Sequence, residues 1–289
     1  MVMEQPSRKH FRNNADVLRA AKSPEDATTA LSSISTEVTN DTANGDDETL
    51  KAVLQTMTKY LLHPTAQVQA CTILMKCAYS NNDTRSTINK HGGIDAILAA
   101  MKGHPKVAAV QEKACGALGY LTFNSDNAFK IAAKGGIDTI LAAMKEHPKV
   151  AAIQEKACGA LGNLTFNSDN NTIKISAKGG IHAILAAMKE HREVAAVQEN
   201  ACGVLRNLSA DSDDILVQIA SQGGIDAILA AMKAHPKVAV VQENACGALW
   251  NLSVHSDDIL LQIASQGGID AILTAMKAHP KVAVSVGER

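Results

Sequence analysis

The stretch GGIDAILAAMKAHPKV, residues Gly223–Val238, decides how this chain folds, because near-copies of it recur along the sequence. The copies begin at Gly92, Gly135, Gly179 and Gly267, so that successive copies, including that at Gly223, are 43, 44, 44 and 44 residues apart. A unit this short cannot bury its own apolar face and has to pack against the copies before and behind it. The sequence therefore predicts an elongated array of repeats.

Five cysteines repeat in the same register. Cys115, Cys158, Cys202 and Cys246 follow one another in steps of 43, 44 and 44 residues, and Cys71 precedes them by 44. Stacking holds equivalent positions roughly 8 to 10 Å apart, about one helix spacing, which is beyond the reach of a disulfide. We therefore expect these cysteines to be small buried apolar residues.

The unit Ser212–Val254 reads as three helices. The first is short, with its first residue as the N-cap, and it ends at Gly223, which suits the left-handed position after a helix. The second has apolar residues at helical spacing from Ile225 and ends before Pro236, because the residue before a proline is disfavoured in a helix. The third and longest helix runs from about Lys237 to about Ser253.

Three helices of this order and length, in a period near 43 residues, resemble the armadillo repeat. The likeness rests on the GGI turn, on the second-helix run that ends in HP, and on a closing pattern AxxALxNLS. That pattern reads ACGALWNLS at Ala245–Ser253, ACGVLRNLS at Ala201–Ser209 and ACGALGNLT at Ala157–Thr165. A HEAT repeat is the nearest rival, but it has two helices per unit. The resemblance implies an all-α fold, a right-handed α-solenoid of the armadillo type.

Four complete repeats lie between incomplete ends. We expect a mobile tail over residues 1–22 and a degenerate capping repeat over 23–80, with a loop at 40–47. The armadillo array then covers 81–289, with units near 81–123, 124–167, 168–211 and 212–255, and an incomplete unit 256–289.

The last unit stops a few residues into its third helix, without the polar outer face that terminal repeats normally carry. Two explanations are open: this end docks another subunit, or the chain is a fragment of a longer protein and further repeats follow. Either way, we expect the apolar side chains of this end to be partly uncovered, namely Ile269, Ile272, Leu273, Met276, Val282, Val284 and Val286.

The composition excludes some classes of partner. A formal net charge of -1 supplies no field that would attract nucleic acid. No apolar stretch reaches the roughly 18 residues of a membrane span, and the N-terminus lacks the apolar core of a signal peptide. We therefore expect no nucleic-acid partner, no membrane span, and a location in the cytoplasm, with the nucleus also open.

The resemblance also indicates where a partner would bind. In armadillo proteins the third helices line a concave groove, and a row of asparagines bonds the backbone of an extended peptide between tryptophans four residues earlier. Here Asn163, Asn207 and Asn251 match the asparagine, and Tyr120 replaces it in the first complete unit. The tryptophan position is glycine in all four units, at Gly116, Gly159, Gly203 and Gly247. The resemblance thus implies a smoother and shallower groove.

Two further positions of the third helix are candidates for the groove. Beside the asparagine lies the most variable position of the repeat, where Arg206 and Trp250 stand, and we expect these two residues to anchor a bound segment. A carboxylate row one helical turn before the glycine could attract lysine or arginine, and it consists of Glu112, Glu155, Glu199 and Glu243.

A histidine at the end of every second helix suggests a metal site, but repeats roughly a helix spacing apart cannot bring their ligands within about 2.5 Å of one ion. We expect these histidines to cap helix C-termini instead. They are His104, His147, His191, His235 and His279. No phosphate-binding loop or nucleophile–base set stands out from the repetition.

The sequence therefore favours a non-enzymatic scaffold whose groove binds an extended peptide or a helix of another protein. We expect no catalytic residue, no metal and no cofactor. Two alternatives remain open: an adaptor of the nuclear-transport type that holds a basic peptide, and a regulatory armadillo fragment of a larger multidomain enzyme such as a kinase.

Overall fold

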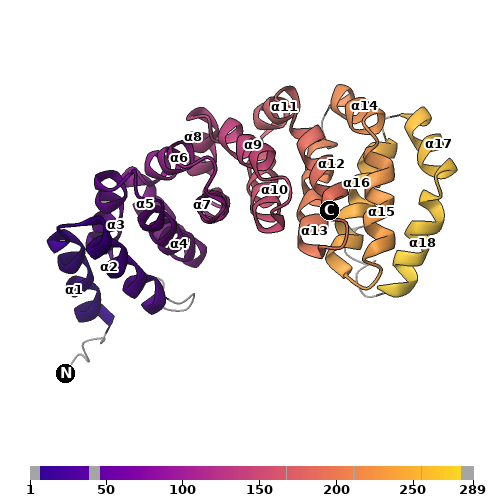
Figure 1. Ribbon diagram of the computed structural model, residues 1–289. Coiled ribbons are helices and arrows are strands. Elements are labelled where there is room, and N and C mark those ends of the chain that lie inside the picture. Colours follow the sequence, from indigo (N-terminus) through magenta and orange to yellow (C-terminus); the bar gives the residue numbers. More distant parts are fainter. Residues whose placement is uncertain (1–6, 39–45, 167, 211, 255, 281–289) are drawn as a thin grey trace. The chain divides into compact units, whose positions relative to one another are not determined.

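A computed structural model describes residues 7–38, 46–166, 168–210, 212–254 and 256–280 of this chain. The described part consists of α-helices and the short connections between them (Figure 1). It divides into two compact units, unit 1 ending at Glu146 and unit 2 beginning at His147. The predicted all-α, armadillo-type solenoid is confirmed, because within each unit short, medium and long helices alternate and stack on their equivalents.

Unit 2 shows the repeat most clearly. Its third helices are α10 (Ala151–Thr165), α13 (Ala195–Leu208) and α16 (Ala239–Val254). Its first helices are α11 (Asp169–Ala177), α14 (Asp213–Ser221) and α17 (Asp257–Ser265). Its second helices are α12 (Gly180–Glu190), α15 (Gly224–Ala234) and α18 (Gly268–Ala278). Third helices pack on third helices, α10 on α13 and α13 on α16, and second helices pack on second helices.

The turn between first and second helices requires both glycines of the GGI motif. Gly223 has φ +86°, which confirms the predicted left-handed position. At Gly224 a Cβ atom would lie 2.7 Å from the carbonyl oxygen of Ile219, so the first helix approaches too closely for any side chain. The predicted N-cap Ser212 does stand at the N-cap position of α14, but its hydroxyl accepts no bond from the helix.

The core is built from Ala, Ile, Leu, Val, Met and Cys side chains. All six cysteines are free thiols, and Cys71, Cys158 and Cys202 are completely buried, as predicted. Cys246, in the last third helix, is only partly buried. Burial raises the pKa of the Cys158 and Cys202 thiols to about 12, so both stay protonated at neutral pH.

A buried glutamine ties each third helix to the second helix of its own repeat. Nε2 of Gln198 donates to the carbonyl oxygens of Met188 and His191, both at 2.9 Å. These carbonyls belong to the end of α12, where the helix itself supplies no donor. The same two bonds form in other repeats, from Gln67, Gln111 and Gln242.

The histidines tie one repeat to the next. His191 and His235 occupy the C-cap positions of α12 and α15, as expected. Their rings do not bond their own helix, however. Nε2 of His191 lies 2.8 Å from the carbonyl oxygen of Pro148 and that of His235 lies 2.8 Å from that of Arg192. Because a carbonyl can only accept, each Nε2 is the donor.

Unit 1 contains a longer cap than predicted. Its helices are α1 (Ser7–Ala20), α2 (Pro24–Glu37), α3 (Asp47–Lys59), α4 (Pro64–Ser80), α5 (Asn82–Lys90), α6 (Gly93–Gly103), α7 (Ala108–Leu121), α8 (Ser125–Ala133) and α9 (Gly136–Glu146). Helices α2, α4 and α7 form a row of third helices, and α1, α3 and α6 form a row of second helices. Most of the predicted loop at 40–47 lies outside the described residues.

The expectation of a mobile tail over residues 1–22 is wrong for most of that stretch. Ser7–Ala20 forms helix α1, whose Ala15 and Leu18 are buried against α3. The apolar positions in this polar stretch are few but correctly spaced, which explains why composition alone did not reveal the helix. Helix α2 begins with a full capping box between Ser23 and Asp26.

In helix α18, the side chains of Ile269, Ile272, Leu273 and Met276 are partly or largely exposed, as predicted. Ile269 is 58% exposed and Met276 is 50% exposed, whereas the equivalent Ile225 and Met232 of α15 are 0% and 3% exposed. Leu273 is also exposed, and Ile272 is half-buried. The other three residues of that prediction, Val282, Val284 and Val286, lie outside the described residues.

Among the described residues, no single helix is both long and apolar enough to cross a membrane. Two pairs of consecutive helices are long and apolar enough only when the two helices of a pair are counted as one segment. They are α14 with α15 and α17 with α18, which are bent by 67° and 71°.

Candidate binding surface on the third helices

The asparagine row of unit 2 lies in register on consecutive third helices. Nδ2 of Asn207 donates to the carbonyl oxygen of Gly162 at 3.1 Å and to the Thr165 hydroxyl at 3.2 Å, both on the preceding third helix α10. Nδ2 of Asn251 donates to the carbonyl oxygen of Arg206 at 2.8 Å. These amides therefore join repeats, a role that the resemblance to peptide-binding proteins did not indicate.

A shallow hollow of about 210 Å³ lies along this row. It brings together side chains from α10 and α13 that the sequence singled out separately, namely Asn163, Asn207, Glu199 and Arg206, and α16 contributes Asn244. The glycines at the tryptophan position form part of its floor, at Gly159 and Gly203. Because these positions carry no side chain, the hollow stays shallow.

The glutamates of the carboxylate row differ in whether a cation pairs with them in unit 2. Glu155 pairs with Lys156 at 2.6 Å, but the residue after Glu199 is Asn200, and the described residues give Glu199 no cation. Burial, and to a lesser degree the neighbouring Glu155, raises the pKa of Glu199. A cationic group placed beside Glu199 would therefore stabilise the charged form of this carboxylate.

Asparagine replaces the neutralising lysine twice, at Asn200 and Asn244, and both asparagines line the hollow. Asn244 donates from Nδ2 to the carbonyl oxygen of Glu199 at 3.2 Å. Neither residue was among the predicted site residues. The signal was the change from QEK to QEN between otherwise near-identical repeats.

Arg206 lies across the next third helix. A Cβ atom on Gly247 would stand 2.6 Å from Nε and 2.7 Å from Cδ of Arg206, so the missing side chain at Gly247 makes room for the arginine. The glycine at this tryptophan position therefore has a packing reason. Because Gly247 has no side chain, the Arg206 side chain lies directly against α16, at the edge of the hollow.

Two aromatic side chains of unit 2 are exposed near these residues in sequence. Trp250 is 65% exposed on α16 and Phe166, at the end of α10, is 70% exposed and lines the hollow. Trp250 thus remains available as an anchor, although it is not one of the residues that line the hollow. Phe166 was not among the predicted site residues, because it follows the last residue of the repeated third-helix pattern.

Unit 1 differs at the equivalent positions. Glu112 pairs with Lys113 at 2.5 Å, so this carboxylate is neutralised. Tyr120 stands at the asparagine position but packs its ring on Tyr79, with the ring centroids 5.2 Å apart. Glu112 thus resembles Glu155 of unit 2, whereas Tyr120 belongs to an aromatic surface in place of the asparagine row.

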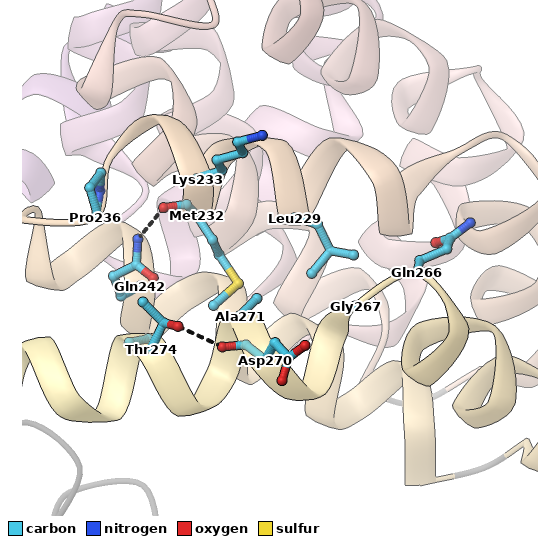
Figure 2. A pocket seen from close by; sticks show the side chains of 11 residues that line it. Leu229, Met232, Lys233, Pro236, Gln242, Gln266, Gly267, Asp270, Ala271 and Thr274 are labelled. Atoms are coloured by element: carbon cyan, nitrogen blue, oxygen red, sulfur yellow. Dashed lines mark hydrogen bonds between the residues drawn. The ribbon is translucent and has the colours of Figure 1, made fainter.

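The second helices of unit 2 leave two more hollows, of about 470 Å³ between α12 and α15 and about 380 Å³ between α15 and α18. Figure 2 shows the latter, where Gln242 bonds the Met232 carbonyl oxygen and Thr274 bonds that of Asp270. These polar groups already bond within their own repeats. The hollows follow from small residues such as Ala271 on the facing helices.

This chain is similar in sequence to one curated protein and in fold to solved armadillo repeat proteins. A segment of 81 residues, 27% of this chain, is 42% identical to the protein aardvark of Dictyostelium discoideum, and the match covers only 11% of that protein's length. A designed armadillo repeat protein has a TM-score of 0.72 at 15% identity, with 84% of this chain and 99% of the designed chain covered.

Another designed armadillo repeat protein, solved in complex with the peptide (KR)4, has a TM-score of 0.70 at 14% identity, again with 84% of this chain and 99% of the other covered. At such identities the likeness concerns the fold alone. The model of the family described as LRRK2 ARM repeat matches residues 80–278 of this chain. That match spans well over half of the chain, and the protein therefore belongs to the LRRK2 ARM repeat family.

Proposed function

We propose that this protein is a non-enzymatic scaffold that binds an extended segment of another protein along the third helices of unit 2. The observation that carries the proposal is the hollow in which Glu199, Arg206 and Asn207 meet. Its polar groups are amides, a carboxylate and a guanidinium spread along three stacked helices. Such a row suits a ligand that is itself linear and repetitive.

The asparagines can contact a peptide backbone while they keep their structural bonds. Within the described residues, the side-chain hydrogen bonds of Asn207 and Asn251 use only Nδ2, so each Oδ1 can accept from a peptide N–H. An extended peptide has unpaired N–H and C=O groups on both sides and needs such partners. The row would therefore fix the path of the peptide and leave side-chain selection to other residues.

Selection would come from the two carboxylates that have no cation in the described residues, Glu199 and Glu243. A lysine or arginine of the bound segment would pair with them. The designed armadillo protein solved with (KR)4 supports this chemistry for the fold. We thus propose a basic segment as the ligand, which is also the ligand of the nuclear-transport alternative.

The test is a fluorescence anisotropy titration of the whole chain with a labelled octapeptide of alternating Lys and Arg. We expect Glu199→Gln with Glu243→Gln to weaken binding roughly 5- to 30-fold, because each exposed ion pair contributes about 0.5 to 1 kcal/mol. The matched control is Glu190→Gln, an exposed carboxylate at the end of α12, which should bind like the parent. Equal binding by all three proteins would refute the site.

The exposed end formed by α17 and α18 suggests a second function. In the preceding repeat the equivalent face of α15 is covered, in part by the third helix α16. We propose that a helix with the third-helix pattern, from a further repeat, covers Ile269, Leu273 and Met276. A synthetic peptide with the sequence of residues 237–254 should bind the chain and raise its melting temperature, and Leu273→Asp should abolish both effects.

A further inference from the structure

Aromatic residues are scarce in this chain, yet they gather at one place in unit 1. The chain has one tryptophan, three tyrosines and four phenylalanines. Two of the tyrosines and one of the phenylalanines, Tyr79, Tyr120 and Phe123, contact one another at the C-terminal ends of α4 and α7. We call these three residues, with Arg85, the aromatic cluster.

The rings of the aromatic cluster are held in fixed positions. Tyr79 and Tyr120 meet edge to face, with an angle of 76° between their planes, and Phe123 lies 6.0 Å from Tyr120. The Arg85 guanidinium lies 5.3 Å from the centre of the Phe123 ring. Arg85 itself is fixed by bonds from Nε to the carbonyl oxygen of Ala78, at 2.7 Å, and from Nη2 to that of Tyr79, at 3.3 Å.

The cluster faces solvent although its surface is largely apolar. Tyr79 is 50% exposed and Phe123 is 55% exposed, while Tyr120 is half-buried between them. Rigid, exposed aromatic rings contribute large contact areas at a low cost in conformational entropy. The cluster therefore has the properties of a recognition surface.

Every polar group of the cluster can donate a hydrogen bond, and the Arg85 guanidinium can only donate. The phenol groups of Tyr79 and Tyr120 bond to no group within the described residues, and the Arg85 guanidinium has N–H groups beyond the two that are bonded. No carboxylate belongs to the cluster. A complementary ligand would present carbonyl oxygens and apolar rings, without a positive charge that Arg85 would repel.

We propose that the aromatic cluster binds a proline-rich segment of another protein in the polyproline II conformation. Proline has no N–H, and the carbonyl oxygens of a polyproline II helix are unpaired, so the ligand is rich in acceptors where the cluster supplies donors. Pyrrolidine rings pack well on aromatic faces, and the ligand is already extended before it binds. This site is separate from the third-helix hollow of unit 2 and differs from it in chemistry.

The experiment is an NMR titration of the whole chain with a decaproline peptide. We expect amide shifts confined to residues 78–86 and 119–124. Tyr79→Ser and Phe123→Ser should weaken binding at least tenfold, and Tyr120→Phe, which keeps the ring and loses the hydroxyl, should weaken it a few-fold. The matched control is Phe129→Ser, a 71% exposed aromatic on α8 that is no member of the cluster.

Melting curves and far-ultraviolet circular dichroism show whether each variant keeps the parent fold, and Tyr120→Phe provides a mild change if a serine variant unfolds. Shifts that are absent at millimolar decaproline would overturn the proposal. So would equal loss of binding in Phe129→Ser, or self-association of the parent that Phe123→Ser abolishes, because the cluster would then bind a second copy. Binding of decaproline should be unchanged by Glu199→Gln with Glu243→Gln, which separates this site from that of the proposed function.

Discussion

The imidazole of His235 donates a hydrogen bond to the main-chain oxygen of Arg192, 43 residues earlier, at 2.8 Å. The same bond joins His104 to Leu61 at 2.6 Å in unit 1. At the cap of unit 1, Tyr60 stands at the histidine position and its hydroxyl donates to Ala21 at 3.1 Å. The residue that follows the second helix thus bonds the preceding repeat in several repeats, with histidine or tyrosine as the donor.

Replacement of His235 by phenylalanine should destabilise the protein by about 1 to 2 kcal/mol, because the buried aromatic ring is kept while the partly buried hydrogen bond to the Arg192 carbonyl oxygen is lost. Urea unfolding measures this cost. His279 makes the equivalent bond to Pro236 at 2.9 Å but lies at the exposed end, where water can replace the donor. His279→Phe should therefore cost less than half as much, and equal costs would show that the bond contributes nothing specific.

Gln198→Met should be more damaging than the histidine change. The substitution preserves length and removes the amide, which leaves the carbonyl oxygens of Met188 and His191 without their donor inside the protein. We expect a loss of about 2 to 3 kcal/mol in the free energy of unfolding. Gln222→Met is the control, since Gln222 is exposed; a similar loss there would point to the methionine and not to the missing bonds.

The repeat architecture could be predicted from the sequence, because Gly223 and its equivalents mark the same helix boundary in successive repeats. The sequence was not sufficient for the bonds between repeats. Gln198 recurs four residues before the cysteine in every repeat, but a recurring polar residue on a helix is normally read as exposed. Only the packing of one helix on another shows that its amide points inward.

The candidate site was predictable in its positions and not in its internal geometry. The spacing placed Asn207 and Asn251 on one face, but it could not show that their Nδ2 groups bond the preceding helix. Likewise, the glycine at position 247 was compatible with either close packing or drift. The position of the Arg206 side chain over Gly247 depends on the contact between two repeats, which no single helix encodes.

This contact can be measured by a double-mutant cycle. Alanine at position 247 should gain up to about 1 kcal/mol from helix propensity, but in the parent protein that gain is offset because Arg206 has to move away. In the Arg206→Ala background the full gain should appear. Urea unfolding of the four proteins gives the coupling, and additive effects would mean that Arg206 does not rest on Gly247 in solution.

The buried thiols predict how stability depends on alkaline pH. Burial raises the pKa of Cys71, Cys158 and Cys202 from about 9 to about 12. Below pH 9 the thiols are protonated in both the folded and unfolded states, and their burial costs nothing extra. Between about pH 9 and 12 only the unfolded chain loses these protons, so the free energy of unfolding falls by up to about 1.4 kcal/mol per pH unit for each thiol.

Lysine and tyrosine titrate in the same range, so the comparison has to be between variants. Cys202→Ala removes one buried thiol and should flatten the decline between pH 9 and 11, whatever its cost at pH 7. Cys246→Ala removes a partly exposed thiol and should change the slope less. Urea unfolding at pH 7, 9, 10 and 11 provides the slopes. If Cys202→Ala and the parent decline in parallel, the thiol at this position ionises in the folded protein, and the helices around it are packed less tightly than the structure indicates.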